Sequence, residues 1–154
     1  MKLIENQYIK RLDYNSAQEY INESWSLSNC VIELLDINAL EFLKEVTITN
    51  CIIHNLSIHT SWFSGGLNFT NNIVLSDIDY QMGGHNKKEV RFEGNVFKGF
   101  FSFFDCQFDA KLIVKDNIFI YGTDLFTKED MGFDNTFENG FIVENNIGKL
   151  DVFN

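Results

Sequence analysis

The sequence contains no proline and no long apolar run, and both absences narrow the class of protein. No stretch approaches the roughly 18 apolar residues of a membrane-spanning helix, so none is predicted. The opening MKLIENQYIKRLDY also lacks the apolar segment and cleavage site of a signal peptide. We therefore expect a cytoplasmic protein, or one that works in the cytosol of a host cell.

Cysteine is scarce, and familiar catalytic and metal-binding motifs are missing. Three cysteines, an odd number, argue against a disulfide framework and fit a reducing compartment. There is no CxxC or HExxH motif, no Gly-rich phosphate loop and no nucleophile elbow. His54 and His59 are expected on different sides of the molecule, and His85 in a loop. No metal, cofactor or catalytic residue is predicted, and we expect the protein not to be an enzyme.

Basic residues are also few. Twelve Lys and Arg face twenty-two Asp and Glu, which gives a net charge of -10. Such a surface repels phosphates, so direct binding to nucleic acid or to an anionic membrane is not expected. A basic protein surface is the more favourable partner.

What the sequence does have is a repeat built from pairs of residues two apart. The pairs run at spacings of five and six through the segment 90–119, so that one unit of two pairs takes eleven residues. The pairs of this segment are Val90/Phe92, Asn95/Phe97, Phe101/Phe103, Cys106/Phe108, Leu112/Val114 and Asn117/Phe119. The same register extends back to Trp25 and reappears near Phe141.

Residues two apart lie on one side of a strand, so each pair is a short inward-facing strand. Repetition at a fixed period indicates a solenoid, here a parallel β-helix of about six coils of 21–23 residues. Sixteen Phe suit an interior filled by aromatic rings. Residues 1–24 do not fit the repeat and are predicted to form a cap, with a short helix started by the capping box of Ser16 and Glu19. Residues 25–154 form the predicted β-helix, with loops at 75–89 and 120–131.

The opening residue of every second pair is a cysteine or an asparagine, which predicts inward ladder positions. These positions, together with the central phenylalanines of the core, are Cys30, Cys51, Asn72, Asn95, Cys106, Asn117, Asn146, Phe97, Phe103, Phe108 and Phe119.

Short matches such as FEGNVF, FFDCQF and KDNIF place a small or polar residue two before a central Phe. In this the chain resembles the pentapeptide-repeat proteins from about Trp25 onward. The resemblance implies a right-handed, four-sided β-helix. The period of eleven differs from the ten of that family, and bulky Val, Leu or Phe often replace the small residue. A three-sided helix similar to that of pectate lyases is the alternative.

If two units make one coil, both loops leave the same side of the helix, where a binding surface is predicted. Its residues are His59, Trp62, Phe104 and Gln107, with His85, Lys87 and Lys88 from the first loop. The alternative is that the two aromatic side chains lie under the loops and anchor them.

These features predict an acidic interaction protein that binds a basic or nucleic-acid-binding protein, as an inhibitor, an immunity protein or a DNA mimic. The DNA mimic is what the resemblance implies, since some pentapeptide-repeat proteins look like duplex DNA. One alternative is a carbohydrate-binding or carbohydrate-cleaving β-helix that uses Trp62, Phe104 and a carboxylate pair such as Asp77 and Asp79. Another is a structural scaffold. A homodimer through the C-terminal coil is also predicted, because Leu150 and its neighbours have no obvious cap.

Overall fold

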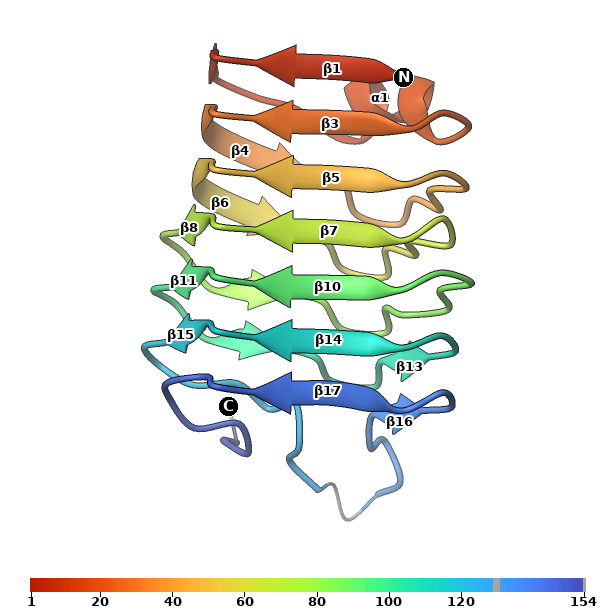
Figure 1. Cartoon of the computed structure of the whole chain (residues 1–154), viewed down its shortest axis with the longest axis vertical. Helices are drawn as coiled ribbons and strands as arrows, with labels where there is room; N and C mark the ends of the chain where they lie inside the picture. Colours follow the sequence, from red (N-terminus) through yellow and green to blue (C-terminus); the bar gives the residue numbers. More distant parts are fainter. Residues whose placement is uncertain (129–130, 154) are drawn as a thin grey trace.

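The chain winds into stacked coils, and each coil contributes one four-residue strand to a long parallel sheet (Figure 1). The computed structural model of the protein describes residues 1–128 and 131–153. The strands of this first side are, in spatial order, β1 (Lys2–Glu5), β3 (Trp25–Ser28), β5 (Val46–Thr49), β7 (Leu67–Thr70), β10 (Val90–Glu93), β14 (Leu112–Lys115) and β17 (Phe141–Glu144). The predicted all-β class and parallel coils are confirmed.

Register fixes the length of each coil. Equivalent residues of successive first-side strands are 23, 21, 21, 23, 22 and 29 residues apart along the chain. The first five values lie within the predicted range of 21–23 residues. The sixth coil is longer because the chain between β14 and β17 contains an insertion.

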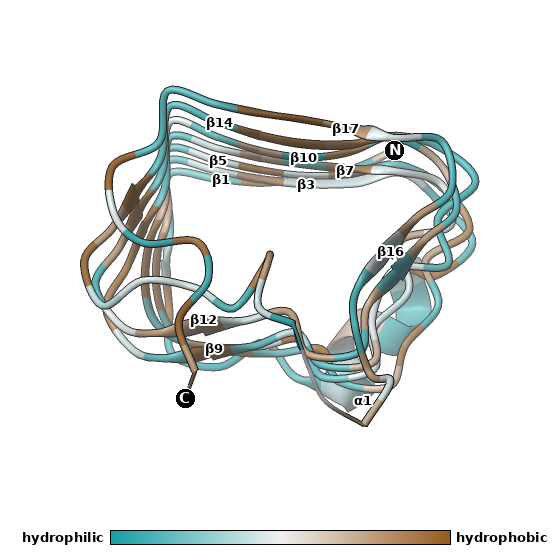
Figure 2. Cartoon of the chain, turned by 90° about the horizontal axis from the view of Figure 1, so that it is seen from below, coloured by the Kyte–Doolittle hydropathy of each residue, from teal (hydrophilic) through white to brown (hydrophobic). Residues whose placement is uncertain are grey.

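The remaining strands form three further sides around the interior (Figure 2). An eight-stranded sheet bends around the corner between the second and third sides, because β4 and β6 run through both. The second side also holds β2 (Tyr8–Ile9), β8 (Ile73–Val74), β11 (Val96–Phe97) and β15 (Ile118–Phe119), next to β4 (Val31–Asp36) and β6 (Ile52–Ser57). The third side adds β9 (Ile78–Asp79) and β12 (Phe101–Ser102), and the fourth holds β13 (Gln107–Phe108) and β16 (Thr136–Phe137).

The corner after each first-side strand needs a left-handed residue. Six of the seven corners use Asn or Asp, whose short polar side chains tolerate this conformation, and one uses glycine. The φ angles lie between 53° and 70° at Asn6, Asn29, Asn50, Asn71, Gly94, Asp116 and Asn145. This column turns the chain from the first side to the second in every coil.

The inward residues are those of the predicted pairs. From Trp25 to Phe119, the paired residues of the uninterrupted units are all buried. Aromatic rings stack between coils, as Phe97 does on Phe119 with ring centroids 5.0 Å apart. Four inward pairs per coil account for four sides. The core is therefore one continuous column along the molecule.

Buried asparagines form a hydrogen-bonded ladder just after the first corner. The Oδ1 atom of Asn95 accepts the backbone N–H of Asn72 at 2.8 Å, and its Nδ2 donates to the carbonyl of Phe69 at 2.9 Å. The pattern continues through Asn117 and Asn146. Each side chain thus pairs backbone groups of neighbouring coils that the strands leave unpaired. Cys30 and Cys51 occupy the same column, whereas Cys106 lies at another corner and donates its thiol to Tyr80.

The first 24 residues differ from the predicted cap. Strands β1 and β2 pair with β3 and β4, so this segment is a coil of the solenoid itself. Its helix α1 (Tyr14–Ala17) is followed by the 3-10 helix η1 (Gln18–Tyr20). The N-cap is Asp13, whose carboxylate accepts the N–H of Ser16, and not Ser16 as the capping box predicted. The inward pairs start with polar Lys2, which hid this coil from the repeat pattern.

The predicted loop at 75–89 also differs, because most of it stays in the wall of the solenoid. Gly84 bridges to Trp62 and to Gln107, and Asn86 is fully buried. A Cβ atom on Gly84 would lie 2.1 Å from the carbonyl oxygen of Gln107, so only glycine permits this approach. The coil accommodates its two extra residues at two separate places.

The second predicted loop, 120–131, begins later than expected. Thr123 bridges to Phe101, and Leu125 is buried, so the chain remains in the wall there. Glu129 and Asp130, part of the predicted charged turn, lie outside the described residues. The insertion that lengthens this coil therefore falls between Thr127, which is buried, and Thr136, where β16 rejoins the wall.

Candidate binding face on the third side

The outward residues of the third side form an acidic face. Register pairs align Asp36 with Ser57, Ser57 with Asp79, and Asp79 with Ser102 in successive coils. Asp77, two residues before Asp79, is on the same side of its strand. We call these five residues the acidic face.

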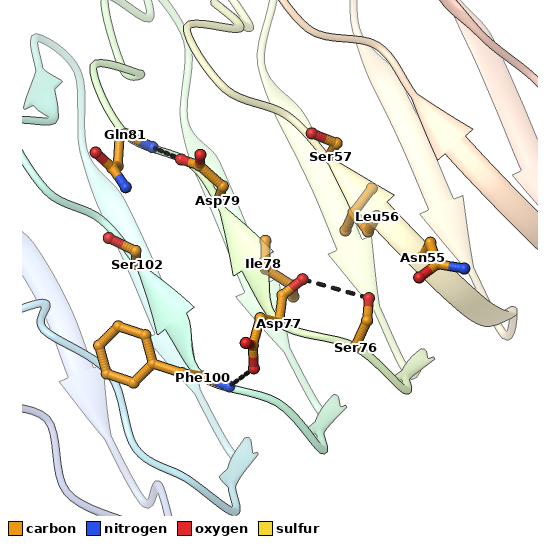
Figure 3. A pocket seen from close by; sticks show the side chains of 10 residues that line it. All are labelled: Asn55, Leu56, Ser57, Ser76, Asp77, Ile78, Asp79, Gln81, Phe100 and Ser102. Carbon is orange, nitrogen blue, oxygen red and sulfur yellow. Dashed lines mark hydrogen bonds between the residues drawn. The ribbon is translucent and has the colours of Figure 1, made fainter. Parts of the chain in front are cut away.

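A surface hollow of about 490 Å³ lies across β6, β9 and β12 on this face. Figure 3 shows the side chains that line it, among them the carboxylates of Asp77 and Asp79. Hydroxyl and amide groups of Ser57, Ser102 and Gln81 complete its polar lining. No lysine or arginine is among the residues that line the hollow, so its charge is negative.

A bulge in the chain places Asp77 at the rim. β6 runs without a break, whereas the next coil divides the same path into β8 and β9, with one extra residue between them. Gly99 of the following coil packs beneath this bulge. A Cβ atom at Gly99 would lie 2.3 Å from the backbone nitrogen of Asp77, so a larger residue would displace it.

Hydrogen bonds hold Asp79 in place. Its Oδ1 accepts the backbone N–H of Gln81 at 3.0 Å, and both carboxylate oxygens lie 3.1 Å from Nδ1 of His59. His59 is anchored in turn, because its backbone N–H donates to Oδ1 of Asn38 at 2.7 Å. The orientation of this carboxylate is therefore set before any ligand arrives.

The serines and Asp77 are fixed as well. Oδ1 of Asp77 accepts the backbone N–H of Phe100 at 2.7 Å, which leaves Oδ2 for a ligand. The Ser57 hydroxyl donates to Asn38 and the Ser102 hydroxyl to Asp124, each at 2.9 Å. Neither hydroxyl donates to His59 in the described part of the chain. The face presents prearranged acceptors, and no serine is paired with an imidazole base.

Metal ligation finds no support in the described ranges, where no group of three His, Cys, Asp or Glu side chains converges. The buried thiols are poor nucleophiles. Burial raises the pKa of Cys51 to about 11, and it raises the pKa of Cys106 well above the ordinary range.

The residues predicted as a binding surface do not share one surface. Trp62 and His85 do meet on the fourth side, with ring centroids 4.5 Å apart, and the Trp62 indole donates to the carbonyl of Met82. His59 instead faces Asp79 on the third side. Gln107 is exposed on β13, one coil beyond Gly84.

Phe104 and the two lysines lie elsewhere again. Phe104 is half-buried, and its ring packs against Phe133 of the longer coil at 5.7 Å. The two predicted surface aromatics, Trp62 and Phe104, thus each contact a ring from the next coil, as the anchoring alternative stated. Lys87 and Lys88 line a separate hollow of about 400 Å³.

Sequence reasoning raised Asp77 with Asp79 but missed that Asp36 and the serines join them. The signal was available, because these residues stand midway between the two members of an inward pair, and the middle residue must point outward. Aligning the middle residues of successive coils would have found the face.

Among the described residues, none of the helices is long and apolar enough to span a membrane. Comparisons with family models, curated proteins and solved structures found no match to this chain.

Proposed function

We propose that the protein is a non-enzymatic interaction module whose acidic face binds a basic group of another protein. The observation that carries this proposal is the hollow at Asp77 and Asp79, where two fixed carboxylates stand side by side without a neighbouring lysine or arginine. A Lys or Arg side chain entering it would gain charge-assisted hydrogen bonds from acceptors that need no rearrangement. The overall charge of -10 adds long-range attraction for such a partner.

The resemblance to pentapeptide-repeat proteins refines this proposal. Four inward pairs per coil support a right-handed, four-sided helix of that type in preference to a three-sided one. An inhibitor or immunity protein in the cytoplasm would use the acidic face against a basic effector. A DNA mimic needs acidic charge along the molecule, and basic side chains such as Lys98 and Lys115 on other sides leave the third side for that role.

The test compares two variants of equal net charge. Asp77→Asn with Asp79→Asn removes the charges at the hollow, and Glu5→Gln with Glu138→Gln removes two exposed charges elsewhere. Fluorescence anisotropy would measure binding of a labelled Lys/Arg-rich peptide at low and physiological ionic strength. We expect the Asp variant to bind about tenfold more weakly and the Glu variant to bind nearly as wild type. Equal losses in both variants would show that attraction is merely due to net charge, and the proposal would fail.

A second candidate function is carbohydrate binding. It is favoured by the mixed lining of the same hollow, where the amides of Asn55 and Gln81 accompany the carboxylates and hydroxyls. Such groups bind sugar hydroxyls in both directions. Binding of a neutral oligosaccharide would be insensitive to salt, whereas binding of the basic peptide weakens with salt. If neither ligand binds, the scaffold role remains as the reading to test.

Self-association through the C-terminal coil is also part of the proposal. Its inward residue Phe141 is 48% exposed, although the equivalent Leu112 one coil earlier is fully buried. A second copy stacked on this end would cover that ring together with Phe153.

A further inference from the structure

The second side carries an apolar ladder on its outer surface. In every coil the first outward residue of this side is aliphatic or aromatic. Backbone register joins the seven into one column, which we call the apolar ladder: Tyr8, Val31, Ile52, Ile73, Val96, Ile118 and Ile147. Ile52, Ile73 and Ile118 are 36–39% exposed, and the two end residues are 65% exposed.

The fold does not require this ladder. Inward pairs already supply the core, and the corresponding outward positions on the first side are polar, as Thr47 and Asn68 show. An unbroken exposed apolar row is unusual on a soluble surface and marks an interface. Its β-branched residues have few side-chain rotamers, so little conformational entropy is lost when they pack.

We propose that the apolar ladder is the interface of an antiparallel dimer between two copies of this chain. A second copy presents the same row with the same step of about 4.8 Å between coils, so the side chains of the two rows can interdigitate along their whole length. With the two-fold axis along the strand direction, midway between the coils of Ile52 and Ile73, each of these residues faces the other in the second copy. Val31 then faces Val96.

Charges beside the ladder select this orientation. The second outward residue of the same side is Glu33 in one coil and Lys98 three coils later. The two-fold axis sets Glu33 of each copy against Lys98 of the other, which gives two ion pairs. Lys98 is exposed and forms no ion pair within residues 1–128 and 131–153. Glu33 accepts a hydrogen bond from the Tyr8 hydroxyl, which holds the carboxylate beside the ladder. A parallel dimer would leave these charges on opposite edges.

The size of the face sets the expected affinity. Six steps of about 4.8 Å give a length of about 29 Å, and a side of about five residues is about 17 Å wide. This is less than the roughly 800 Å² per partner of a standard interface. We therefore expect a reversible dimer that dissociates on dilution. The acidic face on the third side stays open in it.

Analytical ultracentrifugation over a concentration series tests the dimer. Wild type should pass from monomer to dimer, and Ile73→Lys should remain monomeric where wild type is dimeric. Thr47→Lys adds the same charge to an outward position of the first side and should dimerise normally. Circular dichroism and thermal melting would check that each variant is folded.

Charge exchange tests the register. Glu33→Lys and Lys98→Glu should each weaken the dimer, and the double variant should restore it. Failure to restore would overturn the antiparallel register. A dimer that persists in Ile73→Lys but is lost in Phe141→Ser would assign self-association to the C-terminal coil and overturn the proposal. A wild type that stays monomeric and co-sediments with vesicles of phosphatidylcholine and phosphatidylserine would identify a bilayer as the occupant instead, and one that stays monomeric without binding vesicles would also refute the dimer.

Discussion

Two buried threonines show at the scale of single residues how the solenoid treats polar atoms. The hydroxyl of Thr127 donates to the carbonyl of Val152 at 2.9 Å. Thr123, four residues earlier and fully buried, points inward, and its hydroxyl has no hydrogen-bond partner in the described part of the chain. A buried hydroxyl without a partner loses its hydration and gains nothing in return.

Replacing these hydroxyls by methyl groups should therefore act in opposite directions. We expect Thr123→Val to stabilise the fold by about 1 kcal/mol, because an unpaired polar atom is removed without a change of shape. Thr127→Val should destabilise it by about 1 kcal/mol, because it leaves the Val152 carbonyl unpaired. Urea denaturation of both variants gives the two free energies of unfolding. If Thr123→Val is the more destabilising change, a partner for its hydroxyl exists that the described contacts do not include.

The asparagine ladder is the clearest case at the scale of elements. One amide side chain joins three coils, since Asn95 accepts from Asn72 and donates both to Phe69 and to Asn117. The chain cannot use strand pairing here, because the left-handed corner has just turned its backbone groups inward. The ladder is a structural part of the corner in every coil from Asn72 onward.

Changes in this column should follow the hydrogen-bonding capacity of the side chain. Asn95→Leu leaves buried backbone groups of Asn72 and Phe69 unpaired, and we expect it to cost about 3 kcal/mol or more. Cys51→Asn should instead stabilise by about 1 kcal/mol, because the new amide can reach Cys30 and Leu27 as Asn72 reaches Cys51 and Ile48. Thermal melting of both variants measures the difference. A destabilising Cys51→Asn would mean that the column is too narrow there for an amide.

For the whole molecule, the sequence predicted most of the fold and little of the binding face. Inward pairs such as Phe101/Phe103 are visible because strand alternation leaves a strict pattern of two. The coil at 1–24 was missed because Lys2 takes an inward place at an uncovered end, where no apolar residue is needed. Faces such as the row from Asp36 to Ser102 combine residues about 22 apart, so they appear only when the coil length is known.

Stability along the stack should also be uneven, because each coil contacts only its neighbours. β10 has a strand on each side, whereas β17 pairs only with β14 and exposes residues on both of its faces. Hydrogen exchange at a concentration where the protein is monomeric should therefore show amides of β17 exchanging at least about tenfold faster than those of β10. β5, also between two strands, serves as the control and should match β10. Equal protection of β17 and β10 would mean that the last coil is covered, which would favour an end-to-end dimer over the apolar ladder as the first contact between copies.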